Sequence, residues 1–176
     1  MITDDKKEQV VRLCKDGDSA AWLELIESCS GRMLSYFIAN VRNRSVAEDL
    51  LSDFYIKLYK SIDGYKGGSF EAWLYKIAYS VFCDYLRKTM RERENVQQYH
   101  EEMAHLQDAG EAEEELPDVV SALDGLDEES RSLVMLRYYS DMSFKEIAEV
   151  TGKPIGTVLT KVHRALKKLK TKLIIE

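Results

Sequence analysis

The segment SFKEIAEVTGKPIGTVLTKVHRALKKLKTK, at residues 143–172, constrains the fold of this chain more than any other. Ser143 and Glu146 form an S-x-x-E capping box, which predicts the start of a short helix. Gly152 ends that helix, and Pro154 suits the first position of a second helix, where its missing N–H group has no partner to lose. Apolar side chains then recur at every third or fourth position, at Ile155, Val158, Val162, Leu166 and Leu169. One face of the second helix is therefore predicted to be buried.

The opposite face of this second helix consists of hydroxyl and basic groups. They share one side at helical spacing and are Thr157, Thr160, Lys161, Arg164 and Lys168. Two short helices joined by a glycine turn form a helix-turn-helix, whose second helix enters the major groove of DNA. We therefore predict that these five side chains contact duplex DNA.

The net charge of −6 becomes compatible with DNA binding once it is divided along the chain. Residues 1–93 have a net charge of +1, residues 94–118 have nine acids and no Lys or Arg, and residues 119–176 have a net charge of +2. Residues 151–176 contain seven basic groups and a single acid. The positive charge that phosphate binding requires is thus predicted to be local.

The same division predicts the domain organisation. The acidic segment 94–118 separates an N-terminal domain, residues 1–93, from a C-terminal domain, residues 119–176. Weak apolar periodicity in the first half of the segment is compatible with an extension of the preceding helix, whereas residues 108–117 are typical of a flexible linker. Every apolar pattern has the helical period. The predicted fold class is therefore all-α, with two small helical domains joined by an acidic flexible linker.

The N-terminal domain is predicted to contain four to five helices. The first spans Asp4–Lys15 and stops before an Asp-Gly pair. Asp18 or Ser19 caps the second helix, and Gly31 is expected to end or kink it before a third helix over residues 33–41.

Two further helices complete this domain. Ser45 and Glu48 form another S-x-x-E pattern, which predicts the start of a helix there. A loop with three glycines at residues 63–68 indicates a turn. Ser69 then caps a long helix that spans residues 70 to about 93.

The long helix has a buried stripe and an outer face of polar and basic groups. The outer face consists of Lys76, Ser80, Cys83, Asp84, Arg87, Lys88 and Arg91. Aromatic rings are dense in and just before the helix, at Tyr65, Phe70, Trp73, Tyr75, Tyr79, Phe82 and Tyr85. Rings beside cations are what single-stranded nucleic acid binds, because bases stack on rings while cations contact phosphates. The alternative interpretation places most of these rings in the core.

Composition indicates a soluble cytoplasmic protein without a catalytic site. The three cysteines are scattered and odd in number, which suits a reducing compartment. The N-terminal sequence lacks the pattern of a signal peptide, and no apolar stretch is long enough to insert into a membrane. The string HEEMAH at 100–105 resembles a zinc-protease motif, but its histidines are five residues apart rather than four, so a shared metal is not expected. We predict no enzyme activity, no cofactor and no metal.

Three strings of the sequence resemble one protein family. AEDLLSDFYIKLY at 47–59 and SFEAWLYKIAYSVFCDYLRK at 69–88 are similar to the core domain of the extracytoplasmic-function sigma factors of bacterial RNA polymerase. LDEESRSLVMLRYYSDMSFKEIAEVTGKPIGTVLTKVHRALKKLK at 126–170 is similar to the C-terminal domain of the same family. The strings occur in the family's order and cover nearly the whole chain apart from the acidic segment.

The resemblance implies a polymerase subunit that recognises two promoter elements and promotes DNA opening. The helix that begins at Ala47 would dock on the clamp helices of the polymerase β′ subunit, with Asp49, Ser52, Asp53 and Lys57 as candidate contacts. Residues 64–70 would hold a flipped base of the −10 element, whose extrusion costs a few kcal/mol. Lys76, Ser80 and Asp84 would share that role, while Arg87, Lys88 and Arg91 would contact the duplex just upstream.

The C-terminal domain would bind the −35 element and the β flap of the polymerase. Thr157, Thr160, Lys161 and Arg164 would lie in the groove, and Lys168 would lie nearer to the phosphates. The linker of this family threads the polymerase's template and RNA-exit path. Family members are commonly held inactive by an anti-sigma factor clamped between the two domains, and a long linker permits that arrangement.

The sequence departs from the family pattern at three places. Ser80 replaces a common asparagine, Ser52 replaces a glutamine, and residues 159–161 replace a usual Lys-Ser-Arg. These changes bear on the promoter sequence that is recognised. A conventional helix-turn-helix regulator, which dimerises or senses a ligand through its N-terminal domain, remains the alternative hypothesis. It would need neither the docking helix nor the aromatic and basic helix.

Overall fold

The computed structural model describes residues 4–102 and 122–173, and all regular structure in these two ranges is helical. The N-terminal group consists of α1 (Asp4–Lys15), α2 (Ser19–Val41), α3 (Arg44–Ser61), the short η1 (Ile62–Gly64) and α4 (Phe70–Glu102). The C-terminal group consists of η2 (Ala122–Gly125), α6 (Glu128–Val134), the π-helical turn η3 (Met135–Tyr139), α7 (Phe144–Thr151) and α8 (Ile155–Leu173). The prediction of an all-α fold with two helical domains is confirmed. Residues 103–121, which include most of the predicted linker, lie outside the described residues.

The helix ends show which local signals determine them. Asp18 accepts hydrogen bonds from the backbone N–H groups of two residues in the first turn of α2, and Ser69 does so once for α4. Ser143 and Glu146 form the predicted reciprocal capping box at α7. Gly152 then ends α7 with a φ of +68°, a conformation that glycine adopts without strain.

Two predictions about helix ends are wrong. The helix predicted to end or kink at Gly31 continues through it, so that α2 is a single helix of 23 residues. A glycine within a helix costs about 1 kcal/mol, which is less than the burial of neighbouring side chains such as Met33 and Phe37 contributes. The predicted capping box at Ser45 also does not form. Asn43 caps α3 instead, by accepting from the N–H of Val46.

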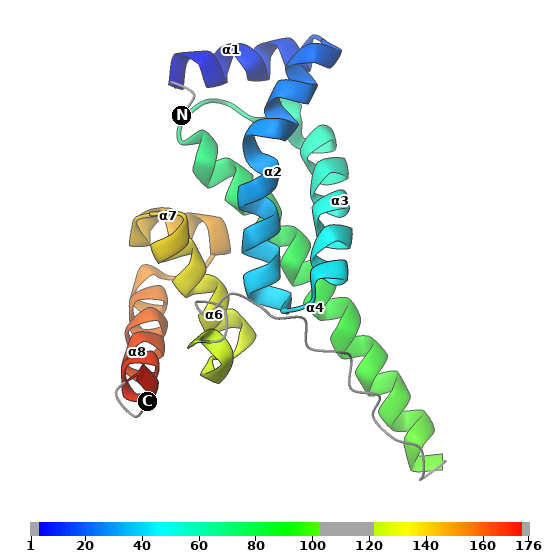
Figure 1. Cartoon of the computed structure of the whole chain (residues 1–176), viewed down its shortest axis with the longest axis vertical. Helices are drawn as coiled ribbons and strands as arrows, with labels where there is room; N and C mark the ends of the chain where they lie inside the picture. The colour runs from blue at the N-terminus through cyan, green and yellow to red at the C-terminus, as the bar shows by residue number, and fades with distance from the viewer. Residues whose placement is uncertain (1–3, 103–121, 174–176) are drawn as a thin grey trace.

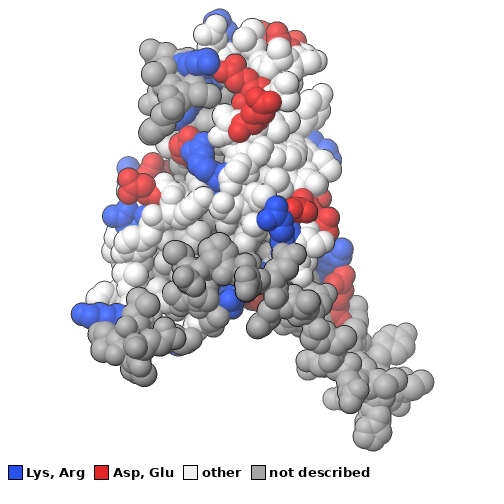
Figure 2. Space-filling model, in the orientation of Figure 1, with Lys and Arg blue, Asp and Glu red and all other residues white. Residues whose placement is uncertain are grey.

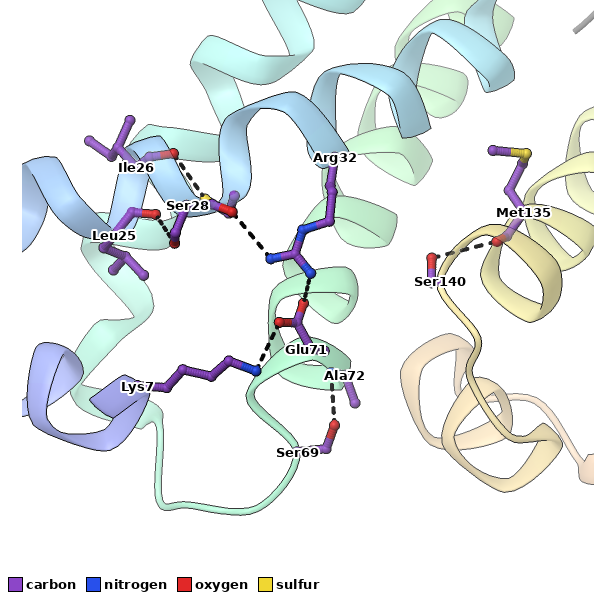
Figure 3. Close-up of polar contacts among 11 residues, drawn as sticks. Lys7, Leu25, Ile26, Ser28, Arg32, Ser69, Glu71, Ala72, Met135 and Ser140 are labelled. Carbon is purple, nitrogen blue, oxygen red and sulfur yellow. Dashed lines mark hydrogen bonds and ion pairs between the residues drawn. The ribbon is translucent and has the colours of Figure 1, made fainter. Parts of the chain in front are cut away.

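The N-terminal core lies between α2, α3 and α4, which pack against one another. Phe37 and Phe54 meet edge to face with ring centroids 6.4 Å apart, and Leu58 and Leu74 are fully buried beside them. α1 crosses one end of this group, as Figure 1 shows, and Glu71 of α4 fixes it there. The Glu71 carboxylate binds Lys7 of α1 at 3.2 Å and Arg32 of α2 at 2.6 Å (Figure 3).

The two helical groups touch and share one continuous core. α7 packs on α4, and α6 packs on α2. The hydroxyl of Tyr36 and that of Ser132 form a buried hydrogen bond of 2.7 Å, and burial raises the pKa of Tyr36 above its ordinary range. Arg131 donates a bond of 2.8 Å to the backbone oxygen of Asn40. That oxygen lies at the C-terminus of α2, where the helix dipole favours a cation.

No helix in the described ranges is long and apolar enough to cross a membrane.

Candidate nucleic-acid interface

The outer face of α4 lies where the sequence predicted it. Its exposed members are Lys76, Asp84, Arg87, Lys88 and Arg91, and Ser80 is half-buried among them. The opposite stripe, which includes Leu74, Ala78 and Val81, is buried against α2 and α3. Burial of that stripe fixes the rotation of α4, so that the polar residues are presented together along one line of the helix.

Lys57 of α3 belongs to this same site. Its Nζ donates to the Ser80 hydroxyl at 2.7 Å and to the Asp84 carboxylate at 2.8 Å. Arg87 binds the other oxygen of Asp84 at 2.7 Å. Lys57 was predicted as a polymerase contact, whereas the structure brings it to the predicted −10 residues. The contact joins two helices, and spacing along one helix gives no signal for it.

The remaining predicted polymerase contacts, Asp49, Ser52 and Asp53, are exposed on one stripe of α3. This stripe continues into Ile56 and Tyr59, whose side chains are 54% and 66% exposed. The Tyr59 ring lies 5.1 Å from the ring of Trp22 on α2 and forms one wall of an apolar hollow. Neither residue was predicted as a contact, although Ile56 and Tyr59 lie four and seven positions after Ser52 and therefore fall on its face by helical periodicity.

The aromatic rings around α4 are mostly part of the core. Tyr65, Phe70, Tyr75 and Phe82 are buried, which supports the core interpretation for them. Three others, Trp73, Tyr79 and Tyr85, are half-buried. Trp73 lies 5.2 Å from the ring of Tyr65 and 5.7 Å from that of Phe70. The side of a ring cluster next to the glycine loop is therefore partly open to solvent.

The outer face of α8 is exposed as predicted. Its exposed members are Thr157, Thr160, Arg164 and Lys168, while Val158 and Val162 are buried against α6 and α7. Ile155 was predicted to be buried but is 48% exposed, because it precedes the part of α8 that packs on its neighbours. Leu159 is 42% exposed, so two apolar side chains one turn apart are open to solvent at the edge of this face.

Lys161 is the one predicted −35 contact that is held within the protein. Its ammonium group pairs with Glu129 of α6, and Lys153 binds the same carboxylate at 2.6 Å. Burial alone would raise the pKa of Glu129, but the hydrogen bonds from Lys153 and Lys161 hold it below its ordinary value. Glu129 therefore fixes the start of α8 relative to α6.

Charge is mixed on the face that Figure 2 presents, where basic and acidic groups lie next to each other. No group of His, Cys, Asp and Glu in the described residues could hold a metal ion. The HEEMAH string lies outside the residues whose side chains are described.

Comparisons with known proteins agree with this arrangement. The family model of Sigma-70 region 2 matches residues 25–92, and the model of Sigma-70 region 4 matches residues 117–169. RNA polymerase sigma factor SigV of Bacillus subtilis is 30% identical over 134 residues, which cover 76% of this chain and 79% of SigV. The chain belongs to the extracytoplasmic-function family of RNA polymerase sigma factors.

Two further relatives extend the comparison of this sigma factor. ECF RNA polymerase sigma factor SigE of Mycolicibacterium smegmatis is 31% identical over 170 residues, covering 88% of this chain and 63% of SigE. Among solved structures, the sigma factor RpoE in complex with the anti-sigma factor NepR, from Bartonella quintana, superposes with a TM-score of 0.70 at 25% identity. That superposition covers 87% of this chain and 96% of RpoE. The resemblance stated from the sequence is confirmed.

The Glu129 ion pairs generate a test of how α8 is fixed. Because the folded-state pKa of Glu129 lies below its ordinary value of 4.5, the pairs stabilise the fold fully above that value and lose their effect as the pH falls through the folded-state pKa. We expect E129Q to reduce the free energy of unfolding at pH 7 by about 1 kcal/mol, measured by urea denaturation. The difference from the wild-type protein should shrink in acid. E149Q, on the exposed side of α7, is the control; a loss for E129Q that is the same at low and neutral pH would contradict the assignment.

Proposed function

We propose that this sigma factor binds core RNA polymerase, directs it to promoters through a −10 and a −35 element, and promotes opening of the DNA. One observation supports this most strongly. A single chain exposes a docking stripe on α3, a polar and basic line on α4 and a helix-turn-helix face on α8. A helix-turn-helix regulator would need only the last of these surfaces.

Docking on the polymerase β′ clamp is assigned to the stripe of Asp49, Ser52 and Asp53, continued by Ile56 and Tyr59. Stable interfaces combine an apolar centre with a polar rim, and aromatic residues are enriched at such centres. The exposed side chains of Ile56 and Tyr59 supply apolar area that no described helix of this chain covers. The carboxylates would then set the register with a basic partner surface.

Recognition of the −10 element is assigned to the glycine loop 64–70 and to the line of Lys76, Ser80 and Asp84 on α4, with Lys57 now added to it. A flipped base needs hydrogen-bond partners for its edge and a surface to stack on. The Lys57 ammonium lies within 2.8 Å of both the Ser80 hydroxyl and the Asp84 carboxylate, so that donors and acceptors gather here. Arg87, Lys88 and Arg91 would contact phosphates of the adjoining duplex.

Recognition of the −35 element is assigned to α8, through Thr157, Thr160, Lys161 and Arg164, with Lys168 near the phosphates. The exposed Leu159, with Ile155 one turn before it, adds an apolar component at the edge of this face. Apolar side chains in the major groove contact the methyl group of thymine. We therefore expect a −35 element with a thymine opposite Leu159. The C-terminal domain would also contact the polymerase β flap.

Binding both elements requires the two domains to separate. α8 packs on α7 and α7 packs on α4, so only two helix spacings of about 10 Å each lie between the two reading helices. The centres of the −10 and −35 elements are about 25 base pairs apart, which corresponds to roughly 85 Å of duplex. The closed arrangement would suit the inactive state, and an anti-sigma factor that contacts both domains would favour it.

The proposed roles of α3 and α4 predict two different defects in transcription. Wild-type protein plus core polymerase should give specific transcripts from promoters of its own genome. D53A should weaken core binding about tenfold, as expected for a lost charged contact, and recover at high protein concentration. K57A should bind core polymerase normally but form fewer open complexes, measured by permanganate reactivity of the −10 region. Failure of the wild-type protein to direct any specific transcript would refute the function, and a core-binding defect in K57A would return Lys57 to the docking surface.

The recognition helix predicts a defect that depends on the −35 sequence. L159A should reduce transcription severalfold from a promoter with thymine at the contacted position, because an apolar contact with the methyl group, worth about 0.8 kcal/mol per buried carbon, is lost. Replacing that thymine by uracil, which lacks the methyl group, should reduce wild-type activity and leave L159A unchanged. R164A should reduce transcription from both templates. Equal sensitivity of wild type and L159A to uracil at every −35 position would contradict the contact.

A further inference from the structure

A basic pocket lies between α1 and the glycine loop, outside the surfaces assigned above. Its volume is about 270 Å³, and it is lined by Glu8, Val11, Arg12, Lys15, Tyr65, Lys66 and Gly67. Three of these residues are cations, two from the last turns of α1 and one from the loop. The pocket is therefore formed by segments that are about fifty residues apart in sequence.

Local contacts hold the loop in place against α1. The Nζ of Lys15 donates to the backbone oxygen of Tyr65 at 2.7 Å, and the Tyr65 hydroxyl donates to the backbone oxygen of Gly68 at 2.8 Å. The Tyr65 ring packs edge-on against Phe70, with centroids 5.5 Å apart. Figure 3 shows this loop passing close to α1 before it reaches Ser69. The three cations therefore lie around a loop whose backbone is already held in place by these contacts.

The charges in this pocket are less neutralised than those elsewhere on α1. Lys6 pairs with Glu24, and Lys7 pairs with Glu71. Arg12 and Lys66 are exposed and form no ion pair with any residue in the described ranges. Glu8 is the single acid among the lining residues. The pocket thus has an excess of positive charge next to the loop.

We propose that Arg12, Lys15 and Lys66 bind a phosphate group of the opened promoter strand, next to the base held by loop 64–70. The inference rests on the proposed function, because it places the strand at that loop. Proteins that bind single-stranded nucleic acid combine ring surfaces for the bases with cations along the backbone. Tyr65 belongs both to the ring cluster with Phe70 and Trp73 and to the lining of the basic pocket, so the two are adjacent. α1 thereby becomes part of the DNA-binding surface.

The pocket fits a phosphate better than a base. Arginine and lysine donate several hydrogen bonds and have no acceptor, so they match an oxygen-rich anion. A base edge would also need acceptors. Among the lining side chains these are the Glu8 carboxylate and the Tyr65 hydroxyl, and the hydroxyl already donates to Gly68. A sequence-independent contact of this kind would add affinity for the open strand without changing which promoter is chosen.

The test uses the complete holoenzyme with a forked promoter whose −10 region is single-stranded on one strand. Single phosphates of that strand are replaced, one at a time, by neutral methylphosphonates. We expect a methylphosphonate at one or two linkages beside the flipped base to lower the affinity of wild-type holoenzyme about tenfold, which is the loss expected for one hydrogen bond to a charged group. R12A/K66A should bind the unmodified strand at least tenfold more weakly than wild type. A methylphosphonate at those linkages should not lower the affinity of this variant any further. Its salt dependence should be shallower by about 0.7 for each phosphate contact removed.

Matched variants separate the possible outcomes. K6A removes a lysine from the same helix but outside the pocket, and it should behave as wild type. K15A removes the third cation and also its hydrogen bond to the backbone oxygen of Tyr65, which holds the loop. Thermal unfolding checks that each variant is folded. Equal binding by R12A/K66A and wild type, or an unchanged pattern of methylphosphonate sensitivity in the variant, would overturn the phosphate site. If wild-type holoenzyme binds no promoter specifically, the proposed function itself fails.

Discussion

The packing of α4 against two sets of neighbours is the constraint on which the rest of the structure depends. One side of this helix is buried on α2 and α3, and another contacts α7 of the C-terminal domain. Tyr75 shows the consequence: it is 2% exposed, its ring lies 5.6 Å from that of Tyr36, and it lines a pocket together with Tyr139 and Ser140 of the C-terminal group. The line from Lys76 to Arg91 stays exposed. The surface to which we assign −10 recognition is thus part of what remains exposed once both sides of α4 are packed.

The contact between the domains has a small polar part beside the apolar core that the two groups share. Its polar part consists of few bonds, chiefly those of Tyr36 with Ser132 and of Arg131 with the end of α2. Burial lowers the pKa of Arg131, and the charge of Arg42 nearby lowers it further, so this cation is held at an energetic cost. A net hydrogen bond contributes only about 1 kcal/mol. Binding to polymerase and to two DNA elements would readily offset the loss of these bonds.

Sequence patterns predicted the helices of the fold better than the contacts between side chains of different helices. The capping box at Ser143 and the burial of Val158 and Val162 on α8 follow from local chemistry, and both predictions are confirmed, whereas Ile155 at the start of the same face is exposed. Gly31 and the S-x-x-E pattern at Ser45 show the limit of local signals, because packing overrides the first and a stronger cap precedes the second. Lys57 could not be placed from sequence, since its partners lie on another helix. The pocket between α1 and the glycine loop was likewise invisible until the chain was folded.

The separation of the two domains is the claim that one distance measurement tests most directly. Spectroscopic labels at E27C on α2 and E149C on α7 would report it, because both positions are exposed and outside every assigned surface. Cys14 and Cys29 are buried and have pKa values raised to about 11, so C83S suffices as the background. In the complex with core polymerase and promoter, the label distance should increase by on the order of 40 Å relative to the free protein. An unchanged distance in a complex that transcribes specifically would contradict the account.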